Sequence, residues 1–259
     1  MHVVPGVEVI RRIEAELATC SMQAIIATDA DGTLWSGDVG EDVFGALLEV
    51  RGIREETREA LVREAKLAGL PTSGTVHELA ERIQRATSCG GHSEERCYSM
   101  VAWAFAGWTL LEANEFARDL AKHRRLEKRI HPEMHEVVRW IQTRGIELWV
   151  VSASPVFMVR AVVELLGIEP SRVIGASPGI REGRFVSWLE EPMPFGAGKV
   201  LGLAKAAGDC EIVAAFGDEL FDLEMLARAR VPVAVRPKAR LRECAWKVPL
   251  LVELERLCW

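Results

Sequence analysis

Five short apolar runs alternate along this chain with longer segments of helical periodicity, and this alternation is the strongest constraint on its fold. Neighbouring parallel strands need a long crossover connection, which a helix usually provides, so the pattern predicts an α/β fold around a parallel sheet. The expected strands are Ala24 to Thr28, Glu147 to Ser152, Arg172 to Ala176, Glu211 to Phe216 and Val231 to Val235.

The interval between the first and second expected strands is almost entirely helical in character, from about residue 36 to residue 130. Gly74, Gly90 and Gly91 separate its helical segments. We therefore predict two domains. Residues 1–35 and 131–259 form a core, and residues 36–130 form a helical insertion that lies over the sheet.

Two local signals follow the second expected strand. Ser154 is predicted to be the N-cap of a helix from Pro155 to Leu166, because proline favours the first helical position. The residues 181–184, Arg-Glu-Gly-Arg, lie between two apolar flanks and predict the turn of a β-hairpin.

The composition excludes several classes of protein. With 49% hydrophobic and 27% charged residues among 259, the chain can bury a sizeable core. A formal net charge of -6 and scattered Lys and Arg residues give no basic surface, so nucleic acid is not an expected partner. Residues 1–17 alternate apolar and charged side chains, and no stretch has the roughly 18 apolar residues that span a bilayer. We expect no signal peptide, no membrane partner and a cytoplasmic location.

The six cysteines are far apart in the sequence, and we expect reduced thiols in a well-cored chain without an export signal. Only Cys89, His92 and Cys97 have a spacing that hints at a metal site. A fourth ligand is missing nearby and no standard zinc pattern fits, so we interpret this segment as an ordinary loop of the insertion. The other cysteines are Cys20, Cys210, Cys244 and Cys258.

Carboxylates and a hydroxyl group occur where the expected strands end. Asp29 and Asp31 follow the first strand, Ser152 ends the second, and Asp218 follows the fourth. Because ligands of an open parallel sheet bind at the carboxyl ends of its strands, we expect these side chains to share one site. Two carboxylates as close as Asp29 and Asp31 resist burial unless a cation or a transferable proton compensates their charge.

Lys199 lies near the start of an expected helix, and Asp222 follows Asp218 in the same polar segment. The whole set fits Mg²⁺, which prefers oxygen ligands and shares its remaining positions with water and substrate phosphate. Phosphoryl transfer uses all of these groups at once. Each residue also has a structural alternative: an Asx turn at Gly32 for the first two aspartates, helix caps for Ser152 and Asp218, and a solvated side chain for Lys199.

The order of these residues resembles the four motifs of the haloacid dehalogenase-like phosphatase superfamily. The motifs are DADGT at 29–33, Ser152 in VVSAS, Lys199 in AGK and GDELFD at 217–222, and the resemblance extends from about residue 24 to residue 246. The helical insertion after the first motif is similar to the phosphoserine-phosphatase-like branch. The resemblance implies a Rossmann-like parallel sheet with an inserted helical cap, and Mg²⁺-dependent hydrolysis of a small phosphorylated metabolite.

The resemblance also implies a role for each residue. Asp29 would be the nucleophile that forms an aspartyl-phosphate, and Asp31 would be the general acid and then the general base. The Asp29 carboxylate, the Asp31 backbone carbonyl and Asp218 would bind Mg²⁺, with Asp222 supporting them. The phosphoryl group would be bound by Asp29, Thr33, Ser152, the backbone at Ala153 and Lys199.

Four positions depart from the pattern of phosphoserine phosphatases. Gly32 replaces their usual serine, Phe221 their asparagine, Asp38 their glutamate, and Glu219 a small residue. The proposed nucleophile and metal ligands are unaffected. These departures therefore weaken phosphoserine as the specific substrate.

A second resemblance concerns the leaving group. Asp29, Asp31, Thr33, Trp35, Asp38 and Glu41, together with FAGWTLLE and PMPFGAGK, are similar to bacterial phosphorylcholine phosphatases. Aromatic faces and a nearby carboxylate bind a quaternary ammonium well, and Trp35, Trp103, Trp108 and Glu41 are the candidates. The alternative is that these tryptophans only pack the cap helices.

Three other functions are alternatives. A phosphate-accepting signalling receiver also uses aspartates, a hydroxyl group and a lysine, but it is compact and lacks a large insertion. A catalytically silent relative would act as a binding scaffold, and Glu219 could then disturb metal binding. A hydrolytic dehalogenase would keep Asp29 but needs neither magnesium nor a second aspartate. The sequence leaves the substrate and the oligomeric state open.

Overall fold

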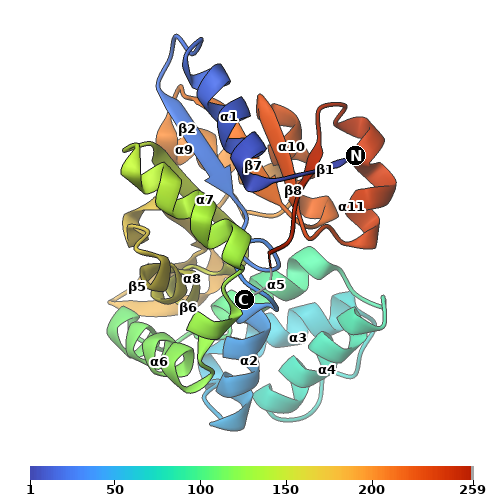
Figure 1. Cartoon of the computed structure of the whole chain (residues 1–259). Helices are drawn as coiled ribbons and strands as arrows, with labels where there is room; N and C mark the ends of the chain where they lie inside the picture. The colour runs from blue at the N-terminus through green and yellow to red at the C-terminus, as the bar shows by residue number, and fades with distance from the viewer. Residues whose placement is uncertain (258–259) are drawn as a thin grey trace.

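The computed structural model describes residues 1–257, in which a seven-stranded sheet carries helices on both faces (Figure 1). The strand order is β1-β9-β8-β7-β2-β3-β4, and every neighbouring pair is parallel. The predicted α/β fold with a parallel sheet is therefore confirmed. The strands are β1 (Val3–Val4), β2 (Ala24–Thr28), β3 (Glu147–Pro155), β4 (Val173–Ala176), β7 (Glu211–Gly217), β8 (Val231–Val235) and β9 (Val252–Leu254).

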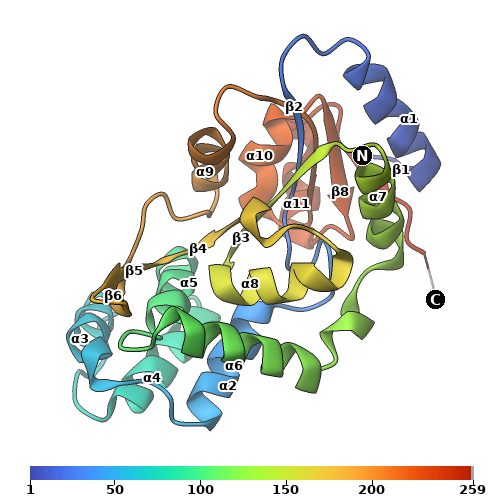
Figure 2. The ribbon, with the colours of Figure 1, turned by 90° about the vertical axis from the view of Figure 1, so that its left-hand side faces the viewer.

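Side-chain alternation in the central strand β2 decides which helices cover which face of the sheet. Ile26 packs in one core cluster together with apolar residues of α1 (Gly6–Leu17) and α7 (Pro132–Thr143). Ile25 and Ala27 point the other way, into a second cluster. That cluster is completed by α9 (Ala197–Ala207), α10 (Leu223–Arg228) and α11 (Ala239–Cys244), which lie on the opposite side of the sheet in Figure 2.

Between β2 and β3 the chain leaves the sheet and forms a separate helical layer, seen in the lower half of Figure 1. Thr75 and Thr109 begin two of its helices with capping boxes, in which a glutamate bonds back to the cap residue. This layer is the predicted helical insertion; its bounds at 36 and 130 stay a prediction. Its elements are α2 (Val39–Glu49), η1 (Glu55–Thr57), α3 (Arg58–Leu67), α4 (Val76–Ser88), α5 (Glu94–Trp103), α6 (Leu110–His123) and η2 (Leu126–Arg129).

A β-hairpin of β5 (Pro178–Arg181) and β6 (Arg184–Leu189) forms at the predicted turn. The two turn residues between the strands both have positive φ, as a tight hairpin turn requires. The hairpin lies beside α5 in Figure 2 and is bonded to the insertion through its backbone. Gly107 N donates to Phe185 O, and Phe185 N donates to Trp108 O, both at 2.8 Å.

The prediction that Ser154 caps a helix is wrong. Strand β3 continues to Pro155, and α8 (Val156–Val163) begins after it without a side-chain cap. The Ser154 hydroxyl instead donates a hydrogen bond to Asp31 Oδ2 at 2.7 Å. The short 3₁₀ segments of the core are η3 (Glu164–Leu166), η4 (Pro170–Arg172), η5 (Leu220–Asp222) and η6 (Ala245–Lys247).

Within residues 1–257 no helix is both long and apolar enough to cross a lipid bilayer. In the segment with possible metal spacing, Cys89 is exposed and His92 Nε2 lies 3.4 Å from Glu64 Oε2. Among the described residues, this loop forms no group of ligands that could hold a metal ion. Cys258 lies outside the described residues, and the free cysteines among the others are Cys20, Cys89, Cys97, Cys210 and Cys244.

Candidate active site

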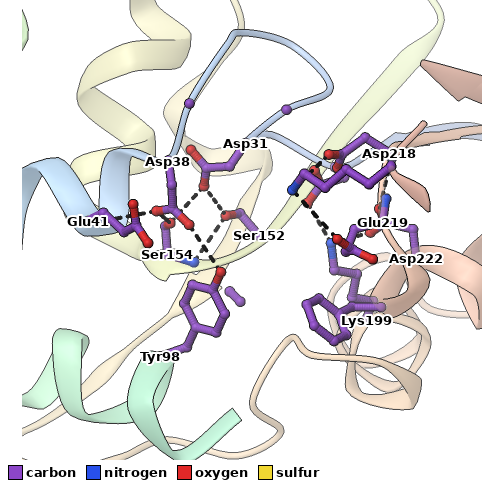
Figure 3. Close-up of a pocket in the computed structure, with 16 residues that line it drawn as sticks. Asp31, Asp38, Glu41, Tyr98, Ser152, Ser154, Lys199, Asp218, Glu219 and Asp222 are labelled. Atoms are coloured by element: carbon purple, nitrogen blue, oxygen red, sulfur yellow. Dashed lines mark hydrogen bonds and ion pairs between the residues drawn. The ribbon is translucent and has the colours of Figure 1, made fainter. Parts of the chain in front are cut away.

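A cavity of about 280 Å³ lies at the carboxyl ends of four adjacent strands, β8, β7, β2 and β3. This is the edge at which open α/β sheets bind ligands. Figure 3 shows two groups of polar side chains that face each other across it. Asp31, Ser152 and Tyr98 belong to one group, and Lys199 and Asp218 belong to the other.

Asp29 follows β2 directly and is buried at the bottom of the cavity. Lys199 Nζ lies 2.5 Å from its Oδ1, and Thr33 Oγ1 donates to its Oδ2 at 3.1 Å. Burial and the charge of Asp222 raise the pKa of Asp29 to about 7, against the opposing effect of Lys199. A single lysine therefore does not compensate the negative charge around Asp29.

Lys199 is buried in the first turn of α9 and connects two carboxylates. Its Nζ lies 2.6 Å from Asp222 Oδ1 and also donates to Val151 O at 3.1 Å. Burial alone would lower the pKa of Lys199, but the carboxylates of Asp222 and Asp29 outweigh it and raise the pKa. The other Asp222 oxygen accepts hydrogen bonds from the backbone N–H groups of Asp218 and Glu219, each at 3.0 Å. Asp222 thus fixes both the lysine and the loop after β7.

Asp31 accepts four hydrogen bonds. Trp35 Nε1 and Val39 N donate to its Oδ1 at 2.8 and 2.7 Å. Ser154 and Ser152 donate to its Oδ2 through their hydroxyl groups at 2.7 and 3.2 Å. Burial and the neighbouring charge of Asp38 raise the pKa of Asp31 to about 6, although the hydrogen bonds oppose the shift. A carboxyl group with this pKa can carry a proton near neutral pH.

Asp218 is buried beside the loop that contains the first two aspartates. Thr33 Oγ1 lies 3.4 Å from its Oδ1, and Lys238 Nζ lies 3.0 Å from its Oδ2 without hydrogen-bond geometry. Within the described part of the chain, no group donates a hydrogen bond to that Oδ2. Burial and the charges of Asp29 and Asp222 raise the pKa of Asp218 to about 8.

Gly32 allows this close approach of the loop to Asp218. Its φ is +83°, and a Cβ atom built on it would lie 2.6 Å from Asp218 Cγ. Any side chain at this position would therefore meet the carboxylate and would also strain the backbone. The departure from serine found in the sequence thus has a structural reason in this chain.

The donor set fits a hard divalent cation such as Mg²⁺. Carboxylate oxygens of Asp29, Asp218 and Asp222 all lie within 4.8 Å of one another. All three are oxygen donors, the pKa values of Asp29 and Asp218 are raised, and one buried oxygen of Asp218 lacks a hydrogen bond. A divalent cation would offset the negative charge around Asp29 and Asp218 and would bind the Asp218 oxygen that lacks a hydrogen bond.

The insertion contributes a second wall. Asp38 and Glu41, at the start of α2, line the cavity together with Tyr98 of α5. Asp38 Oδ1 accepts from Glu41 N at 2.9 Å, and its Oδ2 accepts from the Tyr98 hydroxyl at 3.1 Å. The Glu41 carboxylate has no ion-pair or hydrogen-bond partner among the described residues.

The three tryptophans suggested by the sequence do not line this cavity. Trp35 is 1% exposed; its Nε1 donates to Asp31, and its carbonyl oxygen accepts from Gly32 N at 2.8 Å. Trp103 is also buried. Trp108 donates to Gly52 O at 2.9 Å and packs edge-on against aromatic rings of the insertion.

The cavity is also lined by residues that were not among the predicted site residues, and three of them contribute polar side chains that contact the aspartates of the site. Lys238 follows β8 closely, and a polar residue after a strand indicates a possible site residue. Several other basic residues follow the same strand, so the sequence does not single out Lys238. Ser154 lies two residues after Ser152 and was interpreted as a helix cap. Tyr98 had no signal, because only the packing of α5 against the core brings it to the cavity.

Comparisons with solved structures found proteins that share this fold. A protein from Bordetella pertussis Tohama I of unknown function has a TM-score of 0.66 at 19% identity, over 91% of this chain and 99% of that one. A functionally unknown protein from Anaerococcus prevotii DSM 20548 has a TM-score of 0.67 at 13% identity, over 95% and 90% of the two chains. A substrate-bound phosphoserine phosphatase has a TM-score of 0.52 at 17% identity, over 90% and 93%.

At these identities the likeness shows a shared fold. No curated protein matched the chain in a sequence comparison. A family model, however, matches residues 26–227, which include all four motifs and most of the chain. The chain therefore belongs to the haloacid dehalogenase-like hydrolase family.

Proposed function

We propose that this protein is a phosphatase that hydrolyses a small phosphorylated metabolite through an aspartyl-phosphate on Asp29. The observation that carries the proposal is the convergence of Asp29, Asp31, Lys199 and Asp218 on one cavity. The similarity of fold to phosphoserine phosphatases supports the same reaction class. A dehalogenase would have no use for Asp31, which four donors hold in the cavity wall.

The proposed first step is attack by a carboxylate oxygen of Asp29 on phosphorus, with cleavage of the bond between phosphorus and the ester oxygen. Asp31 donates a proton to the departing alcohol. Its serine donors have rotatable hydroxyl groups, so they can accept a hydrogen bond when Asp31 is protonated. In the second step Asp31 takes the proton from a water molecule that attacks the same phosphorus, which releases phosphate and restores Asp29.

Lys199 and Ser152 are proposed to bind the phosphoryl oxygens, together with Thr33 and the backbone at Ala153. Mg²⁺ would be held by the carboxylates of Asp29 and Asp218 and the backbone carbonyl of Asp31. When bound, it supplies positive charge that lets an anionic phosphate approach a carboxylate.

The decisive experiment is hydrolysis of p-nitrophenyl phosphate with Mg²⁺ and with EDTA. We expect activity only with the metal, and none for Asp29→Asn. Asp119→Asn, an exposed aspartate on α6, is the matched control and should behave as wild type. Quenched wild-type enzyme should carry a phosphoryl group that mass spectrometry locates on Asp29. Turnover by Asp29→Asn would refute the nucleophile.

A second candidate concerns specificity: we propose that the leaving alcohol carries a positive charge, as in phosphoethanolamine or phosphocholine. The observation that favours it is Glu41, whose carboxylate lies in the cavity without a cationic partner in the described chain, close to Tyr98. An ammonium would find a carboxylate and an aromatic ring there. We expect Glu41→Gln to raise KM for phosphoethanolamine and phosphocholine but not for glycerol phosphate; equal effects on all three would refute it.

A further inference from the structure

Lys238 contacts Asp218 twice, although neither the motifs nor the proposed reaction assigns it a role. Its backbone N–H donates to Asp218 O at 2.8 Å, and its Nζ lies 3.0 Å from Asp218 Oδ2. The Asp218 side chain is 2% exposed, whereas the Lys238 side chain is 56% exposed. The lysine therefore reaches into the cavity from its mouth.

The turn that carries Lys238 is fixed from behind. Arg236 has a φ of +46°, a conformation that costs energy for any residue with a side chain. Its guanidinium group is held by Glu133, which is 2% exposed, through contacts of 2.6 and 3.1 Å. Such backbone strain persists only where surrounding contacts enforce it. The turn thus fixes the backbone of Lys238 beside Asp218, within reach of its side chain.

An ammonium at Asp218 and a divalent cation bound by Asp218 would use the same carboxylate. The Lys238 side chain is 56% exposed, so it has room to leave its ion pair with Asp218. Two positive charges a few ångströms apart inside a partly buried site repel each other strongly. The two cations should therefore compete.

We propose that Lys238 is a tethered counter-ion, which compensates Asp218 when the site holds no metal and moves aside when Mg²⁺ binds. The inference rests on the proposed metal site. It makes Lys238 a positioning residue, because it acts on a metal ligand and not on the substrate.

Glu219 provides the place to which the lysine moves. Its Oε2 lies 3.8 Å from Lys238 Nζ, so a small rotation of the lysine side chain exchanges one carboxylate for the other. Glu219 itself is anchored, because its Oε1 accepts from Leu220 N at 2.7 Å. This gives a role to the glutamate that replaces the usual small residue after Asp218.

The test is calorimetric titration of Mg²⁺ into metal-free protein, for wild type, Lys238→Met and Lys238→Arg. Loss of the competing charge should lower the Kd of Mg²⁺ by about tenfold or more in Lys238→Met. Lys238→Arg keeps the charge and should keep the wild-type Kd. Lys247→Met, which removes an exposed lysine of η6, is the control and should leave the Kd unchanged.

Thermal unfolding provides a second measurement that does not depend on activity. Without metal, Lys238→Met should have a lower Tm than Lys247→Met, because Asp218 then lies buried without a counter-ion. In saturating Mg²⁺ this difference should disappear. A double-mutant cycle with Glu219→Gln should show that the loss of Glu219 weakens Mg²⁺ binding more when Lys238 is present than when it is absent.

Two failures can be distinguished. If wild type hydrolyses p-nitrophenyl phosphate with Mg²⁺ but Lys238→Met binds the metal with equal or lower affinity, the counter-ion role is overturned and the phosphatase stands. If wild type neither binds Mg²⁺ nor hydrolyses the ester, both proposals fall.

Discussion

Replacement of Gly32 by alanine should strongly reduce activity without unfolding the protein. The added Cβ would lie 2.6 Å from Asp218 Cγ, whereas ordinary van der Waals contact begins at 3.4 Å. The difference between these two distances means that Asp218 or the loop must shift by at least about 0.8 Å, and Asp218 Oδ2 would lie closer still. Asp218 cannot yield freely, because Lys238 N bonds its carbonyl at 2.8 Å and Thr33 lies against its side chain.

The magnitudes follow from two separate effects. A side chain at φ +83° strains the backbone by about 1 to 2 kcal/mol, which is small against the total stability of a domain of this size. A displacement of catalytic groups by nearly 1 Å can cost about 100-fold in rate. We therefore expect kcat/KM for p-nitrophenyl phosphate to fall by about 100-fold, with a modest loss in the free energy of unfolding.

Gly145→Ala is the matched control. Its φ is +63°, and a Cβ there has open space around it, so the substitution introduces the strain without the collision. Urea unfolding should show at least as large a loss of stability in Gly32→Ala as in Gly145→Ala, whereas only Gly32→Ala should lose activity and Mg²⁺ affinity. If Gly32→Ala hydrolyses the ester as fast as Gly145→Ala, the close approach of the Gly32 backbone to Asp218 is not required for catalysis.

Three further outcomes are expected. Trp35→Phe removes a donor to Asp31 Oδ1 and should slow turnover about tenfold. Trp108→Phe also loses an indole hydrogen bond but should leave turnover unchanged. Equal turnover numbers for these two variants would contradict the prediction. EDTA should lower the Tm of wild type and Mg²⁺ should restore it, so a Tm indifferent to both would remove the metal site. Burial and Arg236 hold the pKa of His131 below 6.5, so the folded state binds fewer protons and its stability should fall as pH drops below that value. His131→Gln should weaken this dependence in urea unfolding at several pH values.

The fold was predictable where the sequence carried a local pattern. The five expected strands are present because each is an apolar run long enough to be recognised, and the insertion was visible as a long helical interval. Strands β1 and β9 were missed. They have two and three residues and pair with each other from opposite ends of the chain, so no local periodicity marks them.

The grouping of the polar residues could be anticipated from chain order, because parallel strands end at a common edge. The directions of individual side chains could not. Trp35 is near Asp29 in sequence, yet its ring is buried in the core and only the indole N–H reaches the Asp31 side chain. Ser154 looked like a helix cap, but the continuation of β3 gives its hydroxyl to Asp31. Tertiary packing decides both cases.

The β5–β6 hairpin connects the helical layer to the segment that leads to Lys199. Its backbone is bonded to the insertion at Gly107 and Trp108, and residues 190–196 then lead directly into the helix that carries Lys199. Any tilt of the helical layer away from the sheet would drag the hairpin with it and pull on that connection. The ammonium that faces Asp29 is thus connected through the backbone to the helical layer, so a tilt of that layer would change how Lys199 contacts Asp29.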